Sequence, residues 1–272
     1  MSGTVAVNGE VCRLEDLRLQ DFLQSFFFGA GFFETLLVEE GAPMFLERHL
    51  ARLRGSLGAH AGCVQPPPPE VLTAGAVREA LRRCLEADAS LGSHFTGVAK
   101  LVAGDGRLLL SFRALPQRSP DEGVVLEAVE DRCYRRGDPT LKHKSVSYLR
   151  QYAHLGRGTV FVNEAGELCE VPNGNLFFLV GEAVVTPPLE APCLPGIIRS
   201  VLLEEGRLGG LPVEVRTLHR EQVEDVRGCV LTNSVSLALA VPRLLGRELA
   251  GSPALAGQAR AVVREYARRD GG

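Results

Sequence analysis

Alternating apolar and polar residues outline strands and helices in the first part of the chain. Residues 4–12 alternate on both sides of Asn8-Gly9, a dipeptide typical of the tight turn of a β-hairpin. Further strands are predicted over residues 32–38, 96–102 and 107–114. Apolar residues at helical spacing predict helices over residues 47–57 and 70–87. The run Phe26-Phe27-Phe28 suits either an interface or the core, and we assign it to the core.

A polar segment with two prolines, residues 115–123, ends this first part. Beyond it, strands are predicted over residues 124–129, 160–162, 176–180, 183–186 and 213–217, and a last one ends at Thr232. Helices are predicted over residues 197–205 and 255–269, and residues 142–155 are expected to be partly helical. Antiparallel strands interspersed with helices indicate the α+β class. We expect an N-terminal domain (1–115), a connecting loop (116–123) and a C-terminal domain (124–272).

Composition excludes several classes of protein. The 272 residues carry a formal charge of −3, which gives no reason to expect a nucleic acid or a membrane surface as partner. No apolar run approaches the length of a membrane helix and the start does not resemble a signal peptide, so a cytoplasmic protein is expected. The seven cysteines are scattered and the histidines lack ligand spacing, so we expect reduced thiols and no metal site.

Lysine is scarce, which narrows any chemistry that needs a primary amine. The chain has three lysines, Lys100, Lys142 and Lys144, among 30 basic residues. Two of them lie within three positions of each other. A lysine in such a segment could form a Schiff base with a carbonyl compound, or the segment could be a basic surface turn.

Other segments offer groups that a phosphorylated, pyridine-like cofactor needs. Arg52 follows the apolar stripe of its predicted helix, so it could bind phosphate or remain a solvated arginine. Glu170 alternates with Leu168 and could be buried against a protonated ring nitrogen, or exposed at a sheet edge. Gly196 precedes a helix whose first N–H groups could bind an anion or simply begin a helix. Classical dinucleotide, Walker and hydrolase motifs are missing from the sequence.

Five motifs in order resemble those of the fold-type IV family of pyridoxal-phosphate (PLP) enzymes, from about residue 7 to residue 241. The motifs are Gly31-Phe32-Phe33-Glu34-Thr35, His49-Leu50-Ala51-Arg52-Leu53, Lys144-Ser145-Val146-Ser147, Glu170 followed by Asn175-Leu176-Phe177, and Gly196-Ile197-Ile198-Arg199. The resemblance implies a two-domain α+β fold with a smaller N-terminal α/β domain and a larger, β-barrel-like C-terminal domain. It also implies PLP as cofactor and a homodimer.

The resemblance implies roles for individual residues. Lys144 is the Schiff-base lysine and catalytic base, and Glu170 pairs with the pyridine nitrogen. The phosphate is bound by Arg52, by the backbone amides of Ile197 and Ile198, and by Ser234. On the substrate side, the candidates are Phe33, Thr35, Tyr148 and Arg107, with Arg113 as a second candidate for a distal carboxylate.

Within the family, the motif His143-Lys144-Ser145 and the Phe33-Glu34-Thr35 run are similar to aminodeoxychorismate lyase. We therefore expect a small amino compound as substrate, with 4-amino-4-deoxychorismate cleaved to 4-aminobenzoate and pyruvate for folate synthesis. A D-amino acid or branched-chain aminotransferase is the alternative.

Overall fold

The computed structural model describes residues 3–116, 123–130 and 134–270. Its contacts divide the chain into two compact units. The first unit comprises residues 1–116 and 143–148, and the second comprises residues 117–142 and 149–271. The segment His143–Tyr148 thus groups with the first unit, although it was predicted to belong to the C-terminal domain.

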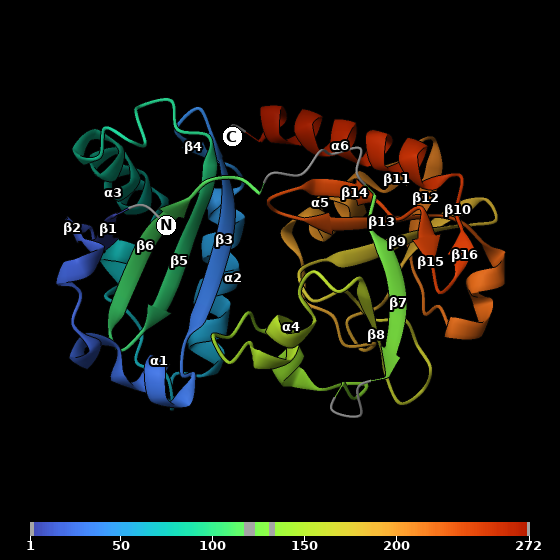
Figure 1. Cartoon of the computed structure of the whole chain (residues 1–272), viewed down its shortest axis with the longest axis horizontal. Coiled ribbons are helices and arrows are strands. Elements are labelled where there is room, and N and C mark those ends of the chain that lie inside the picture. Colours follow the sequence, from blue (N-terminus) through green and yellow to red (C-terminus); the bar gives the residue numbers. More distant parts are fainter. Residues whose placement is uncertain (1–2, 117–122, 131–133, 271–272) are drawn as a thin grey trace. The chain divides into compact units, whose positions relative to one another are not determined.

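The first unit is built on a six-stranded antiparallel sheet with the order β2-β1-β6-β5-β3-β4 (Figure 1). The strands are β1 (Thr4–Val7), β2 (Glu10–Arg13), β3 (Phe32–Glu39), β4 (Ala42–Pro43), β5 (Gly97–Gly104) and β6 (Arg107–Arg113). The predicted hairpin is confirmed, because β1 pairs with β2 across Asn8 and Gly9, whose φ angles are 49° and 86°. A left-handed conformation at both positions is what a tight hairpin turn requires.

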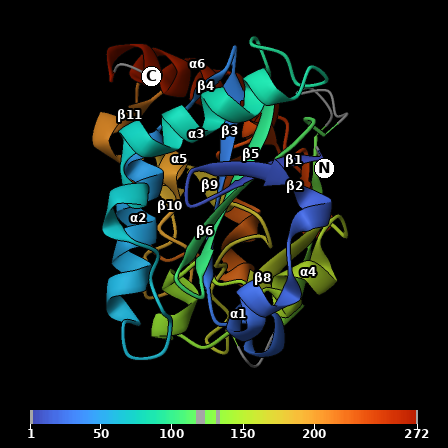
Figure 2. The same ribbon diagram turned by 90° about the vertical axis from the view of Figure 1, so that its left-hand side faces the viewer.

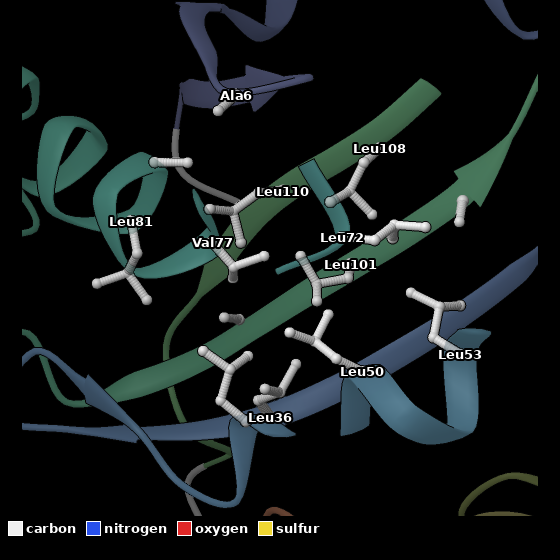
Figure 3. Close-up of a cluster of buried hydrophobic side chains, with 14 of the residues drawn as sticks. Ala6, Leu36, Leu50, Leu53, Leu72, Val77, Leu81, Leu101, Leu108 and Leu110 are labelled. Carbon is white, nitrogen blue, oxygen red and sulfur yellow. The ribbon is translucent and has the colours of Figure 1, made fainter. Parts of the chain in front are cut away.

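Two helices, α2 (Leu46–Ala59) and α3 (Ala74–Ala87), cover one face of this sheet (Figure 2). Leucine and valine side chains from both helices interlock with those of the strands, as Figure 3 shows for Leu50, Leu53 and Leu101. Helix α3 begins later than predicted because Thr73 caps it, its hydroxyl accepting from the Ala76 amide at 3.2 Å.

The assignment of Phe26-Phe27-Phe28 to the core is wrong. These residues end the short helix α1 (Leu23–Phe28), and their exposed fractions are 65%, 63% and 79%. The helix buries none of its residues and stops at Gly29, which adopts a left-handed conformation. An apolar run is therefore present without a neighbouring element to cover it within the described part of the chain.

The second unit contains two sheets. The six-stranded sheet has the order β11-β12-β10-β9-β13-β14, with strands Arg207–Leu208, Leu211–Val215, Ala183–Thr186, Asn175–Val180, Val226–Asn233 and Leu237–Ala240. The four-stranded sheet has the order β16-β15-β7-β8, with strands Arg247–Glu248, Arg243–Leu244, Val125–Glu130 and Thr159–Val162. Together with the first unit, these sheets make the chain an α+β protein of two parts, as expected.

The described residues of this unit form the α-helices α4 (Leu149–His154), α5 (Ile197–Glu205) and α6 (Ser252–Arg269) beside these sheets. The predicted bounds of α5 are confirmed, and α6 begins three residues before its predicted start. Helix α6 packs on β13 and β14 through Leu255, Ala259 and Val263, whose spacing places them on one helix face. No helix among the described residues combines the length and the apolarity needed to cross a membrane.

Candidate functional site

The segment His143–Tyr148 runs beside the start of β3 and so brings two sequence motifs together. The Phe33 amide donates to the Lys144 carbonyl oxygen at 2.8 Å, and the Val146 amide donates to the Gly31 carbonyl oxygen at 3.0 Å. Phe32 and Ser145 form an antiparallel bridge in the same place. Lys144 is therefore held by backbone hydrogen bonds to a core strand, whereas Lys142 ends a short 3₁₀ turn in the second unit.

Aromatic rings surround the Lys144 side chain. Its Nζ lies 4.5 Å from the centroid of the Phe33 ring and 5.6 Å from that of Tyr148, and these two rings meet edge to face at 5.3 Å. Contacts of this kind stabilise an ammonium group and restrict where it can point. Phe33 and Tyr148, both predicted near the substrate, are thus neighbours of the predicted catalytic lysine.

Lys100 contacts the same Phe33 ring as Lys144, although no role was predicted for it. Its Nζ lies 4.4 Å from the same centroid, so the Lys100 and Lys144 ammonium groups are at most 8.9 Å apart, the sum of the two distances. Lys100 pairs in register with Thr35 on β3, and no carboxylate of the described residues lies within 4.0 Å of it. Partial burial and the positive charge of Arg113 lower the pKa of Lys100. The scarcity of lysine was the only sequence signal that pointed to it.

The arginines proposed for a distal carboxylate are placed differently. Arg107 donates to Asp21 at 2.6 Å, which balances its charge. Arg113 is exposed and donates to the carbonyl oxygen of its neighbour Ala114 at 3.5 Å.

A buried ion pair joins the second motif to the first. Arg52 on α2 donates through Nε and Nη2 to the two carboxylate oxygens of Glu34 on β3, at 2.8 and 2.6 Å. His49 adds a hydrogen bond from Nδ1 to Glu34 Oε2 at 2.6 Å, because a carboxylate can only accept. Burial would raise the pKa of Glu34, but the charge of Arg52 and the hydrogen bonds from Arg52 and His49 lower it to about 2. Glu34 is therefore a carboxylate throughout the physiological range.

His49 is neutral in this network. It is fully buried, and burial lowers its pKa despite the attraction of Glu34, while Arg52 and Lys144 lower it further. Its Nε2 atom has no hydrogen-bond partner among the residues that the structure describes. Three of the five motifs, which contain Glu34, Arg52 and Lys144, therefore lie together in the first unit.

In the second unit, Glu170 is buried, with 6% of its surface exposed, as the alternative of a buried carboxylate predicted. The Tyr134 hydroxyl donates to its Oε1 atom, and the Leu194 amide donates to its Oε2 atom at 2.8 Å. Burial, followed by the charge of Glu170, raises the pKa of Tyr134 well above its usual value, so the hydroxyl stays protonated. Tyr134 is fully buried and stacks on Phe161 at 4.7 Å. Tyr134 was not predicted as a site residue, because it belongs to none of the sequence motifs.

Helix α5 begins close to Glu170 in the same unit. Its N-cap is Gly196, and no side chain caps its first turn. The N–H groups of a first helical turn have no partner within the helix and favour an anion. Ile197 and Ile198 are both buried, so these amides lie in a shielded place. A Cβ atom at position 196 would lie 1.9 Å from Asn175 Oδ1, so only glycine allows this approach.

Ser234 lies in the turn after β13, and Thr232 near the end of that strand pairs in register with Asn175 at the start of β9. The turn is stabilised by Asn233, whose side-chain oxygen accepts from the Val235 and Ser236 amides at 3.0 and 2.8 Å. Asn175 in turn contacts the residues before α5, since its Nδ2 atom donates to the Leu194 carbonyl oxygen at 2.8 Å. The last two motifs and the Ser234 turn therefore meet at one end of neighbouring strands.

Comparison with known proteins places this arrangement in a family. Residues 31–244 match the family described as amino-transferase class IV. A bifunctional aminodeoxychorismate lyase / D-amino acid transaminase of Mycobacterium tuberculosis is 29% identical over 255 residues, covering 83% of this chain and 85% of that protein. An aminodeoxychorismate lyase of Bacillus subtilis is 26% identical over 252 residues, covering 85% of this chain and 83% of that protein.

A solved structure shows the same fold. It is a hypothetical aminotransferase from Mycobacterium tuberculosis in its PLP-bound form, with a TM-score of 0.81 at 24% identity, covering 97% of this chain and 99% of that chain. The family match spans well over half of the sequence. The chain therefore belongs to the class IV aminotransferase family and is a PLP-dependent enzyme.

Proposed function

We propose that the enzyme is a 4-amino-4-deoxychorismate lyase that releases 4-aminobenzoate and pyruvate in folate biosynthesis. The observation that carries this proposal is the environment of Lys144, a lysine tied to β3 and lying over Phe33. The two curated relatives described above support the lyase, since both names include that activity. The sequence His143-Lys144-Ser145 supports it as well.

The residues present fit PLP. The cofactor, when bound, supplies an electron sink that stabilises negative charge developing at the substrate Cα atom. Lys144 provides the primary amine that binds its aldehyde and, when released, takes the Cα proton on Nζ. Glu170, a buried carboxylate held by Tyr134 and Leu194, would pair with the pyridine nitrogen and keep its proton in place.

Two kinds of group are assigned to the phosphate. The backbone amides of Ile197 and Ile198 lie at the uncapped start of α5, and the Ser234 hydroxyl follows β13. Arg52 is the proposed cationic contact. Two of its five N–H groups donate to Glu34, which fixes the plane of the guanidinium group.

For the substrate we propose contacts with Phe33, Thr35 and Tyr148, which lie on or against β3 near Lys144. Arg107 remains a candidate, although Asp21 balances its charge. A substrate bearing carboxylates suits this part of the first unit, because the Lys100 ammonium group lies 4.4 Å from the centroid of the Phe33 ring that Lys144 also contacts.

The second candidate is an aminotransferase for D-amino acids or branched-chain amino acids. The Mycobacterium tuberculosis relative favours this alternative, since its name combines the lyase with D-amino acid transamination. Transamination would use the same residues around the cofactor and differ in where the proton is returned.

Two measurements test the proposal. The PLP-loaded protein is reduced with borohydride and digested, and the labelled peptide should contain Lys144. Lys142→Ala should retain the label, whereas Lys144→Ala should lose it together with the visible absorbance. Pyruvate release from aminodeoxychorismate is then compared with keto-acid formation from D- and L-amino acids. Label on Lys142 would overturn the assignment of the lysine, and keto acid without pyruvate release would favour the aminotransferase.

Two further expectations accompany this function. A homodimer predicts a mass in solution of twice the 29.3 kDa of one chain, which analytical ultracentrifugation checks. A cytoplasmic location is the second, and fractionation of the source cells checks it.

A further inference from the structure

One residue of the second unit, Leu194, has both of its backbone polar groups engaged by side chains. The Leu194 amide donates to Glu170 Oε2 at 2.8 Å, and the Leu194 carbonyl oxygen accepts from Asn175 Nδ2 at 2.8 Å. Leu194 therefore connects the carboxylate assigned to the cofactor ring with the side chain of Asn175. We call residues 194–196 the Leu194 turn.

The Leu194 turn has little freedom to move. Pro195 restricts its own φ angle, and Gly196 ends the turn as the N-cap of α5. Gly196 approaches Asn175 so closely that a Cβ atom there would lie 1.9 Å from Asn175 Oδ1. The amides assigned to the phosphate follow immediately, at Ile197 and Ile198.

Asn175 is itself fixed to the sheet. It is the first residue of β9, has 4% of its surface exposed, and pairs in register with Thr232 of β13. The Thr232 hydroxyl donates to the Asn175 carbonyl oxygen at 3.4 Å. Because the backbone of Asn175 is fixed in the sheet, its side chain can hold the Leu194 turn in place relative to the strands.

We propose that Asn175 is a positioning residue that fixes the spacing between Glu170 and the first amides of α5. This inference rests on the roles assigned above to Glu170, Ile197 and Ile198. The two ends of the cofactor, the ring nitrogen and the phosphate, then meet partners whose separation is set before binding. A ligand that carries both ends gains from this arrangement, whereas a ligand with one end does not.

The test compares three ligands: PLP, pyridoxal, which lacks the phosphate, and inorganic phosphate. Their affinities are measured for the wild-type protein and for Asn175→Ala, by absorbance for the two aldehydes and by calorimetry for phosphate. We expect Asn175→Ala to weaken pyridoxal and phosphate each by less than about threefold, and PLP by about tenfold or more. A loss for PLP no larger than the product of the two separate losses would overturn the proposal.

Two more variants separate positioning from stability. Gly196→Ala should show the same pattern, because the added methyl group pushes the Leu194 turn away from Asn175. It also provides the test if Asn175→Ala does not fold. The matched control is Ser252→Ala, which removes a buried hydroxyl that accepts from the Cys229 amide at 2.9 Å and donates to the Val241 carbonyl oxygen at 2.6 Å. This control should be less stable yet keep the PLP affinity expected for its folded fraction.

The outcome also distinguishes this inference from the proposed function. If the Glu170→Gln variant binds pyridoxal as tightly as the wild-type protein does, the role assigned to Glu170 fails and the inference fails with it. If Glu170→Gln weakens pyridoxal but Asn175→Ala and Gly196→Ala both leave PLP affinity intact, the role of Glu170 stands and only the positioning by Asn175 is wrong.

Discussion

Phe33 contacts Lys144 twice, through its backbone amide at 2.8 Å from the lysine carbonyl oxygen and through its ring, whose centroid lies 4.5 Å from the lysine Nζ. The backbone hydrogen bond fixes the position of the Lys144 backbone, and the Phe33 ring limits the directions in which the lysine amine can point. A segment without regular secondary structure thereby gains the rigidity of the core strand beside it. Precise placement of the reacting amine is what nucleophilic catalysis requires.

Lys100→Met should weaken binding of a substrate that bears carboxylates. The substitution removes the ammonium group that lies 4.4 Å from the Phe33 ring centroid and keeps a side chain of similar length. We expect the KM to rise about tenfold, equivalent to about 1.4 kcal/mol, with a smaller change in kcat. Arg78→Met is the control, because this exposed arginine lies on α3 and has no proposed role in substrate binding. An equal rise in KM for both variants would show a general effect of charge.

Glu34→Gln should destabilise the protein by about 3 kcal/mol at pH 7, because it leaves the Arg52 guanidinium without its buried carboxylate. The difference from wild type should shrink on acidification. The pKa of Glu34 is lowered to about 2 in the folded protein, so its contribution is complete above the unfolded value of 4.5 and is lost as the pH falls towards 2. Urea unfolding at pH 7, 5 and 3 measures this. A difference that stays constant down to pH 3 contradicts the ion pair.

Tyr134→Phe should cost about 1.5–3 kcal/mol of unfolding free energy, because a buried carboxylate loses a hydroxyl donor. Tyr266→Phe is a matched control. Its hydroxyl donates to Glu204 at 2.7 Å on the exposed surface, where water replaces the lost donor, so the cost should be under about 0.5 kcal/mol. Equal costs for the two variants would show that burial of the Tyr134 contact does not matter.

Thr73→Ala should cost about 1 kcal/mol, because the threonine hydroxyl caps α3 by accepting from the Ala76 amide. Thr73→Ser should recover most of this loss, since serine offers the same acceptor. Thermal unfolding of the three proteins checks the order. Failure of serine to restore stability would assign the effect to the methyl group of threonine.

Elements with a local cause were predictable from the sequence. The turn at Asn8-Gly9 and the helix 197–205 depend on neighbouring residues, and both are confirmed. The burial of Glu170 was one of two alternatives, and alternation with Leu168 pointed to it. The donors to Glu170 could not be foreseen, because Tyr134 and Leu194 are 36 and 24 positions away from it.

Contacts between segments that are distant in the sequence account for the remaining differences between the predicted and the observed structure. The bridge between Phe32 and Ser145 places the lysine segment in the first unit, and no pattern within either segment encodes that pairing. The run Phe26-Phe27-Phe28 is apolar, but hydrophobicity alone does not say whether another element covers it. The proposed site residues were chosen through the order of the motifs, and their roles remain predictions.

The grouping of residues 143–148 with the first unit has a practical consequence for engineering. No single cleavage of the polypeptide yields both units intact, because the first is assembled from two stretches with part of the second unit between them. A fragment that stops at residue 116 would lack Lys144, the lysine proposed to bind the cofactor. Work on an isolated half therefore requires grafting the hexapeptide onto that fragment or supplying it as a separate peptide.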